Sequence, residues 1–161
     1  MRFLFFILLF ILFKGNAQNI SSSFEIRAGK SLLPADYMAL RYQQATNYPV
    51  DYSVKGFVKH SLVNGLHYSE WGIDLLLEFP FSFFRIGFGP SVQHENEPWI
   101  YNELSTSQKI NYGIATEGMG EWMMSEVFGL QLFAQQKWLF NQLLGKTDFV
   151  FGLGLVYHLN P

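Results

Sequence analysis

The segment from residue 149 to residue 159 alternates strictly between two kinds of side chain. Its odd positions are large and apolar: Phe149, Phe151, Leu153, Leu155, Tyr157 and Leu159. Its even positions are small or polar: Val150, Gly152, Gly154, Val156 and His158. Because successive side chains of a strand point to opposite faces, the pattern predicts a β-strand whose two faces meet different media. One continuous apolar face over roughly 9 to 11 residues is typical of a strand in a transmembrane β-barrel.

The amino terminus has the pattern of a secretory signal peptide. A basic residue precedes an unbroken apolar run over residues 3–13, and a small-residue junction ends at Ala17. The run is shorter than the roughly 20 apolar residues that a membrane-spanning helix needs. We therefore predict a signal peptide over residues 1–17, cleaved after Ala17, and one domain over residues 18–161. An uncleaved anchor or a buried helix is the alternative interpretation.

Composition narrows the classes of function. The chain has no cysteine, so neither disulfides nor thiolate metal ligands are available. Its formal net charge is −2, which argues against direct contact with nucleic acid. Aromatic residues make up 18% of the chain, and this content favours strands over helices. No linker or low-complexity tract divides the chain, so we expect one domain after the signal peptide.

Alternation recurs along the chain between turn signals. Asn64-Gly65 is a strong hairpin signal, Pro80 is expected to end a ladder because it cannot donate to it, and residues 94–108 are expected to form the longest loop. Residues 36–44 also fit a short helix, but counting them as a strand places both chain ends on one side of the barrel. The predicted strands cover residues 22–29, 36–44, 52–62, 66–79, 83–93, 110–123, 127–138 and 149–159. We expect an all-β, closed, antiparallel, up-and-down transmembrane barrel of eight strands in the outer membrane.

We assign the polar faces of these strands to the barrel interior. The predicted lumen residues are Glu25, Arg27, Lys55, Lys59, Glu70, Asp74, Glu78, Arg85, Glu117, Glu121, Gln131, Gln135 and Lys137. Unpaired charges in a low-dielectric interior cost several kcal/mol, so we expect paired, hydrogen-bonded networks. An eight-stranded barrel is only about wide enough for its own side chains, which predicts a plugged barrel without a pore.

The apolar faces are then directed outward, toward outer-membrane lipid. Aromatic residues near the strand ends fit the girdles that lie at the level of lipid headgroups. These residues are Trp71, Tyr112, Trp122, Trp138 and Tyr157. A soluble, periplasmic, lipocalin-like barrel is the alternative, with the bulky face turned inward around a ligand. In that arrangement the glycines of the polar face would have no obvious purpose.

Candidate catalytic residues are few. The 4 histidines are scattered along the chain, so neither a metal site nor a cofactor is expected. His60 and His67 flank the hairpin turn and could approach one another near Ser61 and Glu70, an arrangement that would permit acyl hydrolysis. The resulting alternative is a lipid-modifying barrel enzyme, similar to a lipid A acyl hydrolase. Polar residues at a wet barrel rim are the simpler interpretation.

The predicted long loop over residues 95–108, which we expect on the outer side of the membrane, is the candidate partner-contact surface. It carries Trp99 and Tyr101 among polar residues. Exposed aromatic side chains in such surroundings often anchor protein partners. A solvated loop with Trp99 folded back onto the rim is the alternative.

From residue 109 to residue 159 the chain resembles the conjugal transfer protein TraO family, which comprises small exported proteins encoded with conjugative transposons. The segments that carry the resemblance are Tyr112-Gly113, Glu121, Met123-Met124-Ser125-Glu126, Gln135-Gln136-Lys137-Trp138-Leu139, Gly145-Lys146 and Gly152-Leu153-Gly154-Leu155. The resemblance implies a non-enzymatic envelope component of a conjugative DNA-transfer apparatus. It also implies other envelope proteins as partners, and it supplies no catalytic residues.

Overall fold

The computed structural model describes residues 21–32, 35–63, 66–96, 108–140 and 147–159. Four predictions lie outside these residues: the signal peptide over residues 1–17, the Asn64-Gly65 turn, and the contact residues Trp99 and Tyr101.

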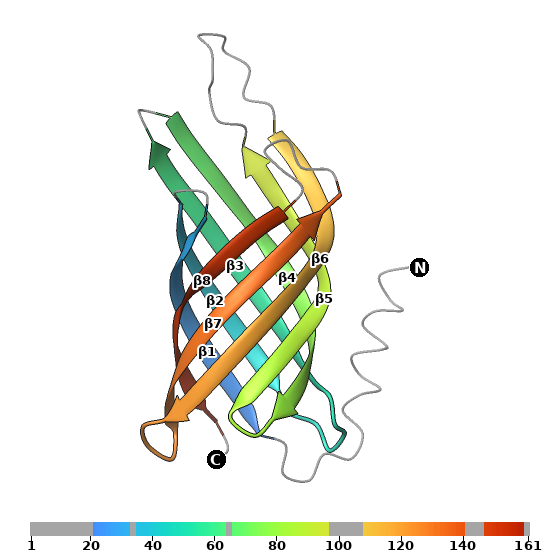
Figure 1. Cartoon of the computed structure of the whole chain (residues 1–161), viewed down its shortest axis with the longest axis vertical. Helices are drawn as coiled ribbons and strands as arrows, with labels where there is room; N and C mark the ends of the chain where they lie inside the picture. The colour runs from blue at the N-terminus through green and yellow to red at the C-terminus, as the bar shows by residue number, and fades with distance from the viewer. Residues whose placement is uncertain (1–20, 33–34, 64–65, 97–107, 141–146, 160–161) are drawn as a thin grey trace.

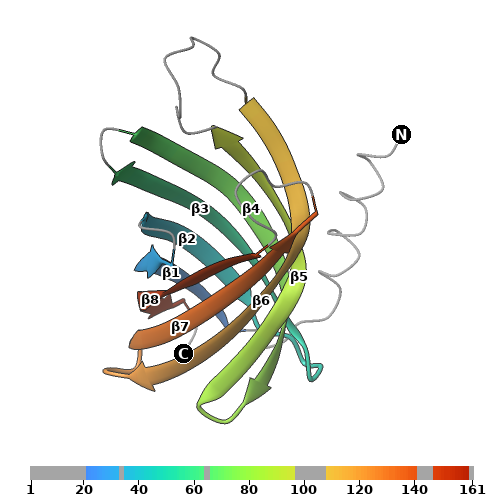
Figure 2. The same ribbon diagram turned by 45° about the horizontal axis from the view of Figure 1, so that its top comes forward.

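The described residues form one closed β-barrel. Each strand pairs antiparallel with the next in the sequence, and β1 pairs with β8 to close the ring. Figure 1 shows the strands crossing the barrel obliquely, and Figure 2 shows them curving around a common axis. The strands are β1 (Ser22–Ser31), β2 (Asp36–Gln44), β3 (Asp51–Val63), β4 (Leu66–Phe81), β5 (Phe84–Asn96), β6 (Gln108–Met123), β7 (Phe128–Leu139) and β8 (Thr147–His158). The predicted all-β, up-and-down barrel of eight strands is confirmed.

The segment that also fitted a short helix is strand β2. It pairs with β1 along one edge, where Ile26 faces Leu40, and with β3 along the other, where Leu40 faces Gly56. With β2 present the strand number is even, so β1 begins and β8 ends at the same end of the barrel (Figure 1). Pairing on both edges explains why this short segment, ambiguous in isolation, is extended.

Several strand ends differ from the predictions, and three of these differences are informative. Pro80 does not end its ladder: it faces Arg85, and β4 continues to Phe81. Alternate positions of an antiparallel ladder need no N–H donor, so a proline can be accommodated there. The predicted loops were also too long, because Glu95 lies within β5 and Asp148 lies within β8. Both strands continue because polar residues can face the interior of this barrel.

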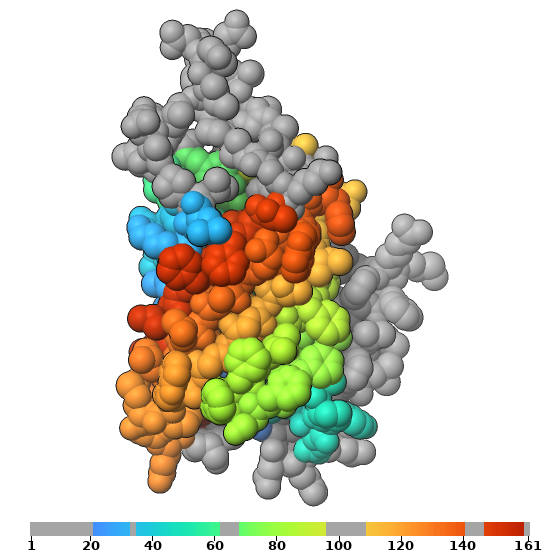
Figure 3. All heavy atoms as spheres, viewed as in Figure 1, coloured from blue at the N-terminus to red at the C-terminus, as the bar shows by residue number. Residues whose placement is uncertain are grey.

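The outer surface is mostly apolar. The interior is mostly polar, with a small apolar cluster that includes Tyr37, Phe57 and Phe133. The predicted girdle residues Trp71, Tyr112, Trp122, Trp138 and Tyr157 are all exposed, by 42% to 56%. Along β8, exposed Phe151, Leu153 and Leu155 alternate with Gly152 and Gly154, which face the lumen. In Figure 3 the outer side chains of neighbouring strands lie in oblique bands across one face. No helix in the described part of the chain is long and apolar enough to cross a membrane.

Several glycines bring neighbouring strands into close approach, and Gly89 and Gly152 are two examples. A Cβ atom at Gly89 would lie 1.9 Å from the backbone oxygen of Leu75, and one at Gly152 would lie 2.2 Å from that of Ala28. Any side chain at either position would collide with the paired strand. Glycine therefore permits the tight curvature of a small barrel at these points.

Candidate functional site

Arg27 is the centre of a buried ion network in the lumen. Its Nε donates to Glu25 Oε1 at 2.7 Å, its Nη1 donates to Glu117 Oε1 at 2.5 Å, and its Nη2 donates to Gln131 Oε1 at 2.7 Å. Lys55 donates to the other oxygen of Glu117. Arginine suits this position because its planar guanidinium presents several donors in a fixed geometry. The network connects β1, β3, β6 and β7, so it crosses the barrel.

A second arginine, Arg41, extends this network. Its Nη1 donates to Glu25 Oε2 at 2.7 Å, and its Nη2 pairs with Glu78. Ser53 also donates to Glu78. Sequence reasoning left Arg41 out of the lumen because the segment 36–44 was ambiguous. Once that segment is a strand, alternation with exposed Leu40 directs Arg41 inward.

Asp74 is the centre of a second group of charges in the lumen, which shares Lys55 with the first group. Lys55 Nζ lies 3.1 Å from Asp74 Oδ2, and Lys137 Nζ lies 3.1 Å from Asp74 Oδ1. Gln135 Nε2 donates to Asp74 Oδ2 at 2.8 Å. Lys137 Nζ also lies 3.2 Å from the centre of the Phe57 ring, which adds a cation–π contact. This carboxylate is therefore held by two cations and an amide from two other strands, β3 and β7.

Lys59 connects carboxylates toward the end of the lumen opposite the one where β1 begins and β8 ends. Its Nζ donates to Glu70 Oε1 at 2.9 Å and pairs with Asp148. The Tyr68 hydroxyl donates to Glu70 Oε2 at 2.5 Å and lies 3.1 Å from Glu95 Oε1. Asp148 and Glu95 were missed as lumen residues because both were assigned to loops. Their inward-facing positions in the alternation of β8 and β5 are the signal that could have found them.

A smaller group lies at the end of the barrel where β1 begins and β8 ends. Glu121 Oε1 lies 2.6 Å from His158 Nε2, and Arg85 Nη2 lies 3.5 Å from Glu121 Oε2. Arg85 also donates to the Gln43 side chain. The side chains of Arg85, Glu121 and His158 are partly exposed, because they line the mouth rather than the middle of the barrel.

The remaining predicted lumen residues are all buried. They are Glu25, Arg27, Lys55, Lys59, Glu70, Asp74, Glu78, Glu117, Gln131, Gln135 and Lys137, each at most 3% exposed. Ion pairs such as Arg27 to Glu117 and Lys59 to Asp148 join strands that are not neighbours in the sheet. The arrangement bridges the lumen with side chains and constrains the barrel against deformation.

The structure does not assemble the candidate catalytic residues into one site. His60 is exposed on the outer surface, whereas Glu70 is buried in the lumen, where it pairs with Lys59. Ser61 is half-buried, and the His67 side chain lies outside the described residues. Since His60 and Glu70 lie on opposite faces of the sheet, the acid could not orient this histidine as a hydrolase requires. Within the described ranges no group of three or more His, Cys, Asp or Glu side chains could hold a metal ion.

Comparison with known proteins places the fold among small outer-membrane barrels. No established family profile matches the chain, and no curated protein matches it. Ail of Yersinia pestis, in a phospholipid nanodisc, has a TM-score of 0.60 and 12% identity, over 88% of this chain and 100% of Ail.

Two further solved structures have the same architecture. The amino-terminal barrel domain of Pseudomonas aeruginosa OprF has a TM-score of 0.55 and 13% identity, over 86% of this chain and 97% of the domain. Neisserial surface protein A has a TM-score of 0.53 and 9% identity, over 86% of this chain and 94% of that protein. At such low identity the similarity shows the fold, which is that of eight-stranded outer-membrane barrels.

Proposed function

We propose that this protein is an outer-membrane β-barrel whose exterior contacts lipid. The observation that carries the proposal is the distribution of side chains: exposed Phe, Leu, Ile and Trp cover the outside, while buried ion pairs occupy the inside. A soluble lipocalin-like barrel has the opposite distribution, with its bulky apolar side chains around an internal ligand. The similarity in fold to Ail and OprF supports the same location.

The barrel serves a structural or interaction role and is neither a pore nor an enzyme. Cross-lumen pairs such as Arg27 to Glu117 place buried side chains where a channel would have to run. The separation of His60 from Glu70 disfavours the lipid A hydrolase alternative.

Fractionation and conductance test this role together. The processed protein should be recovered in the outer-membrane fraction after carbonate extraction, and its electrophoretic mobility should change on heating. Reconstituted into a planar bilayer, it should give no stable conductance steps. Recovery of a folded protein from the aqueous fraction would contradict the membrane location, and reproducible steps would contradict the plugged lumen.

The finer role is that of an envelope component in a conjugative DNA-transfer apparatus, which contacts other envelope proteins through its outer loop. The support is the resemblance of residues 109–159 to the TraO family. Replacing Trp99 and Tyr101 together by alanine should reduce transfer frequency at unchanged protein level. A matched control replaces the exposed inner-turn residue Tyr48 by alanine. Normal transfer with the double variant would show that the loop has no part in this role. Normal transfer after deletion of the gene would show that the protein has no part in it.

The non-enzymatic role is tested by the acyl pattern of lipid A, which should be unchanged when the protein is expressed.

A further inference from the structure

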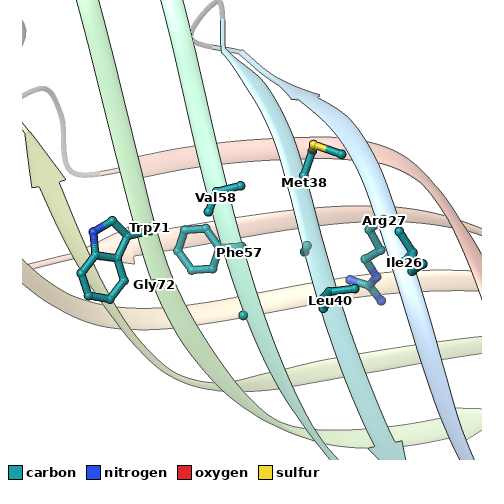
Figure 4. Close-up of a pocket in the computed structure, with 10 residues that line it drawn as sticks. Ile26, Arg27, Met38, Leu40, Phe57, Val58, Trp71 and Gly72 are labelled. Carbon is teal, nitrogen blue, oxygen red and sulfur yellow. The ribbon is translucent and has the colours of Figure 1, made fainter.

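An apolar groove crosses the outer surface over strands β1 to β4. Its volume is about 500 Å³, and its lining includes outward-facing side chains from all of these strands (Figure 4). The outward-facing residues are Ile26, Met38, Leu40, Gly56, Val58 and Trp71. The volume lies within the range of ordinary small-molecule sites.

Gly56 creates this groove. It lies in the ladder between Leu40 of β2 and Ile73 of β4, so the missing side chain leaves a gap between two aliphatic residues. A Cβ atom at Gly56 would meet no atom within 4 Å. At the other glycines of the described chain, an added Cβ would contact at least one neighbouring atom. Unlike Gly89, which permits close strand approach, Gly56 borders open space.

A pair of charged residues lies beyond one end of the groove. Ile26 of β1 faces Leu40 of β2 in the groove, and Lys30 faces Asp36 four residues further along the same pair of strands. Four residues of a strand span about 13 Å. Lys30 and Asp36 pair with each other, and their side chains are 66% and 69% exposed. A lysine ammonium has three donors, so Lys30 retains donors beyond the one directed at Asp36.

We infer that the groove holds one acyl chain of a phosphate-bearing lipid of the outer leaflet, with the phosphate at Lys30. This inference rests on the proposed membrane location. The order of the surface matches the order of a lipid: hydrocarbon against Gly56 and Leu40, then a charged group at the headgroup end. Hydrocarbon is also the medium that surrounds this part of the outer surface, between the aromatic girdles. A flexible acyl chain can fill the gap at Gly56. A flat outer surface would offer no such gap.

Native mass spectrometry of the processed barrel, titrated with dimyristoyl phosphatidylglycerol, tests the inference. The wild type should retain a single lipid. Gly56→Leu fills the groove and should weaken this binding about tenfold or more. Its matched control is Gly118→Leu on the outer face of β6, where an added Cβ would make an ordinary 3.6 Å contact with the Phe84 ring. The control should bind lipid as the wild type does.

The phosphate is tested separately. Lys30→Gln should weaken binding of dimyristoyl phosphatidylglycerol, and dimyristoyl glycerol, which lacks phosphate, should bind the wild type less well. Equal binding of both lipids by the wild type would overturn the role of Lys30. Equal lipid binding by Gly56→Leu and the wild type would show that the groove is not the binding site. A protein dimer that forms in the wild type and is lost in Gly56→Leu would show that a second copy of the chain occupies the groove, and would also overturn the inference. A barrel that reaches the outer membrane without retaining lipid overturns this inference alone, whereas a soluble barrel overturns the proposed function as well.

Discussion

The lumen and the outer surface of this barrel are built from alternate residues of the same strands, yet they differ in almost every property. On β1, Arg27 is fully buried among carboxylates, whereas the adjacent Ile26 is 60% exposed. The lumen is stabilised by specific partners, because a buried charge without a partner is costly. The outer surface has few specific partners, since its side chains need only an apolar medium.

This difference makes the pairing register important. A shift of one residue would exchange the two faces of a strand, so that its charges would lie on the apolar outer surface and its apolar residues would lie in the lumen. The two surfaces should therefore respond oppositely to the same kind of substitution.

The largest effect is expected from Arg27→Met. The change leaves Glu25, Glu117 and Gln131 without their central partner, and it should lower the free energy of unfolding by about 3–5 kcal/mol. Equilibrium urea unfolding of the barrel in lipid vesicles, followed by tryptophan fluorescence, measures it. The control is Ile26→Met on the outer face, which should cost less than about 1.5 kcal/mol. Equal losses of unfolding free energy for Arg27→Met and Ile26→Met would show that the lumen does not depend on specific partners more than the outer surface does.

The next effect is expected from Leu153→Arg on the outer face of β8. Leu153 lies between Ala28 and Leu132 in the ladder and is 53% exposed. An arginine there should cost about 2–4 kcal/mol, the penalty for a charge near the middle of a bilayer. The same unfolding assay measures it, with Leu153→Met as the control. An unchanged unfolding midpoint for Leu153→Arg would show that this face does not contact hydrocarbon.

A smaller loss is expected from Gly89→Ala. The added methyl group would lie 1.9 Å from the Leu75 backbone oxygen, so the paired strands would have to separate. Overpacking of this kind typically costs about 1–3 kcal/mol. The temperature at which the folded form loses its fast electrophoretic mobility should fall. If it does not, the close approach of β4 and β5 at this point is not required for stability.

The smallest effect, and the opposite sign, is expected from Gly56→Ala. Its methyl group would enter open space, and alanine loses less conformational freedom than glycine on folding. The variant should be more stable by about 0.5–1 kcal/mol in the urea assay. A loss of stability would mean that Gly56 is required by the strand itself and not by the groove.

Most of the strand pattern could be predicted from the sequence. The exceptions are residues whose place depends on the assembled barrel. The alternation from Phe149 to Leu159 fixed the outer face of β8, and the same rule applied to β1 and β4. Glu95 and Asp148 were missed because polar residues near a strand end look like a loop when the polarity of the interior is unknown. Arg41 was left out because residues 36–44 also fitted a short helix. Pro80 was misjudged because local chemistry does not say which ladder positions need an N–H donor.

The ion network of the lumen was likewise predictable only in part. Alternation grouped Glu25, Arg27 and Glu117 as polar residues of one surface, because the side-chain period of a strand is a local property. Their partners could not be read in this way: Arg27 and Glu117 come from β1 and β6, and they meet across the lumen only after the ring closes. Likewise, the sequence showed a glycine at position 56, but the groove exists because ladder register places Leu40 and Ile73 on either side of it. Register and closure depend on all strands at once, so these contacts belong to the folded barrel.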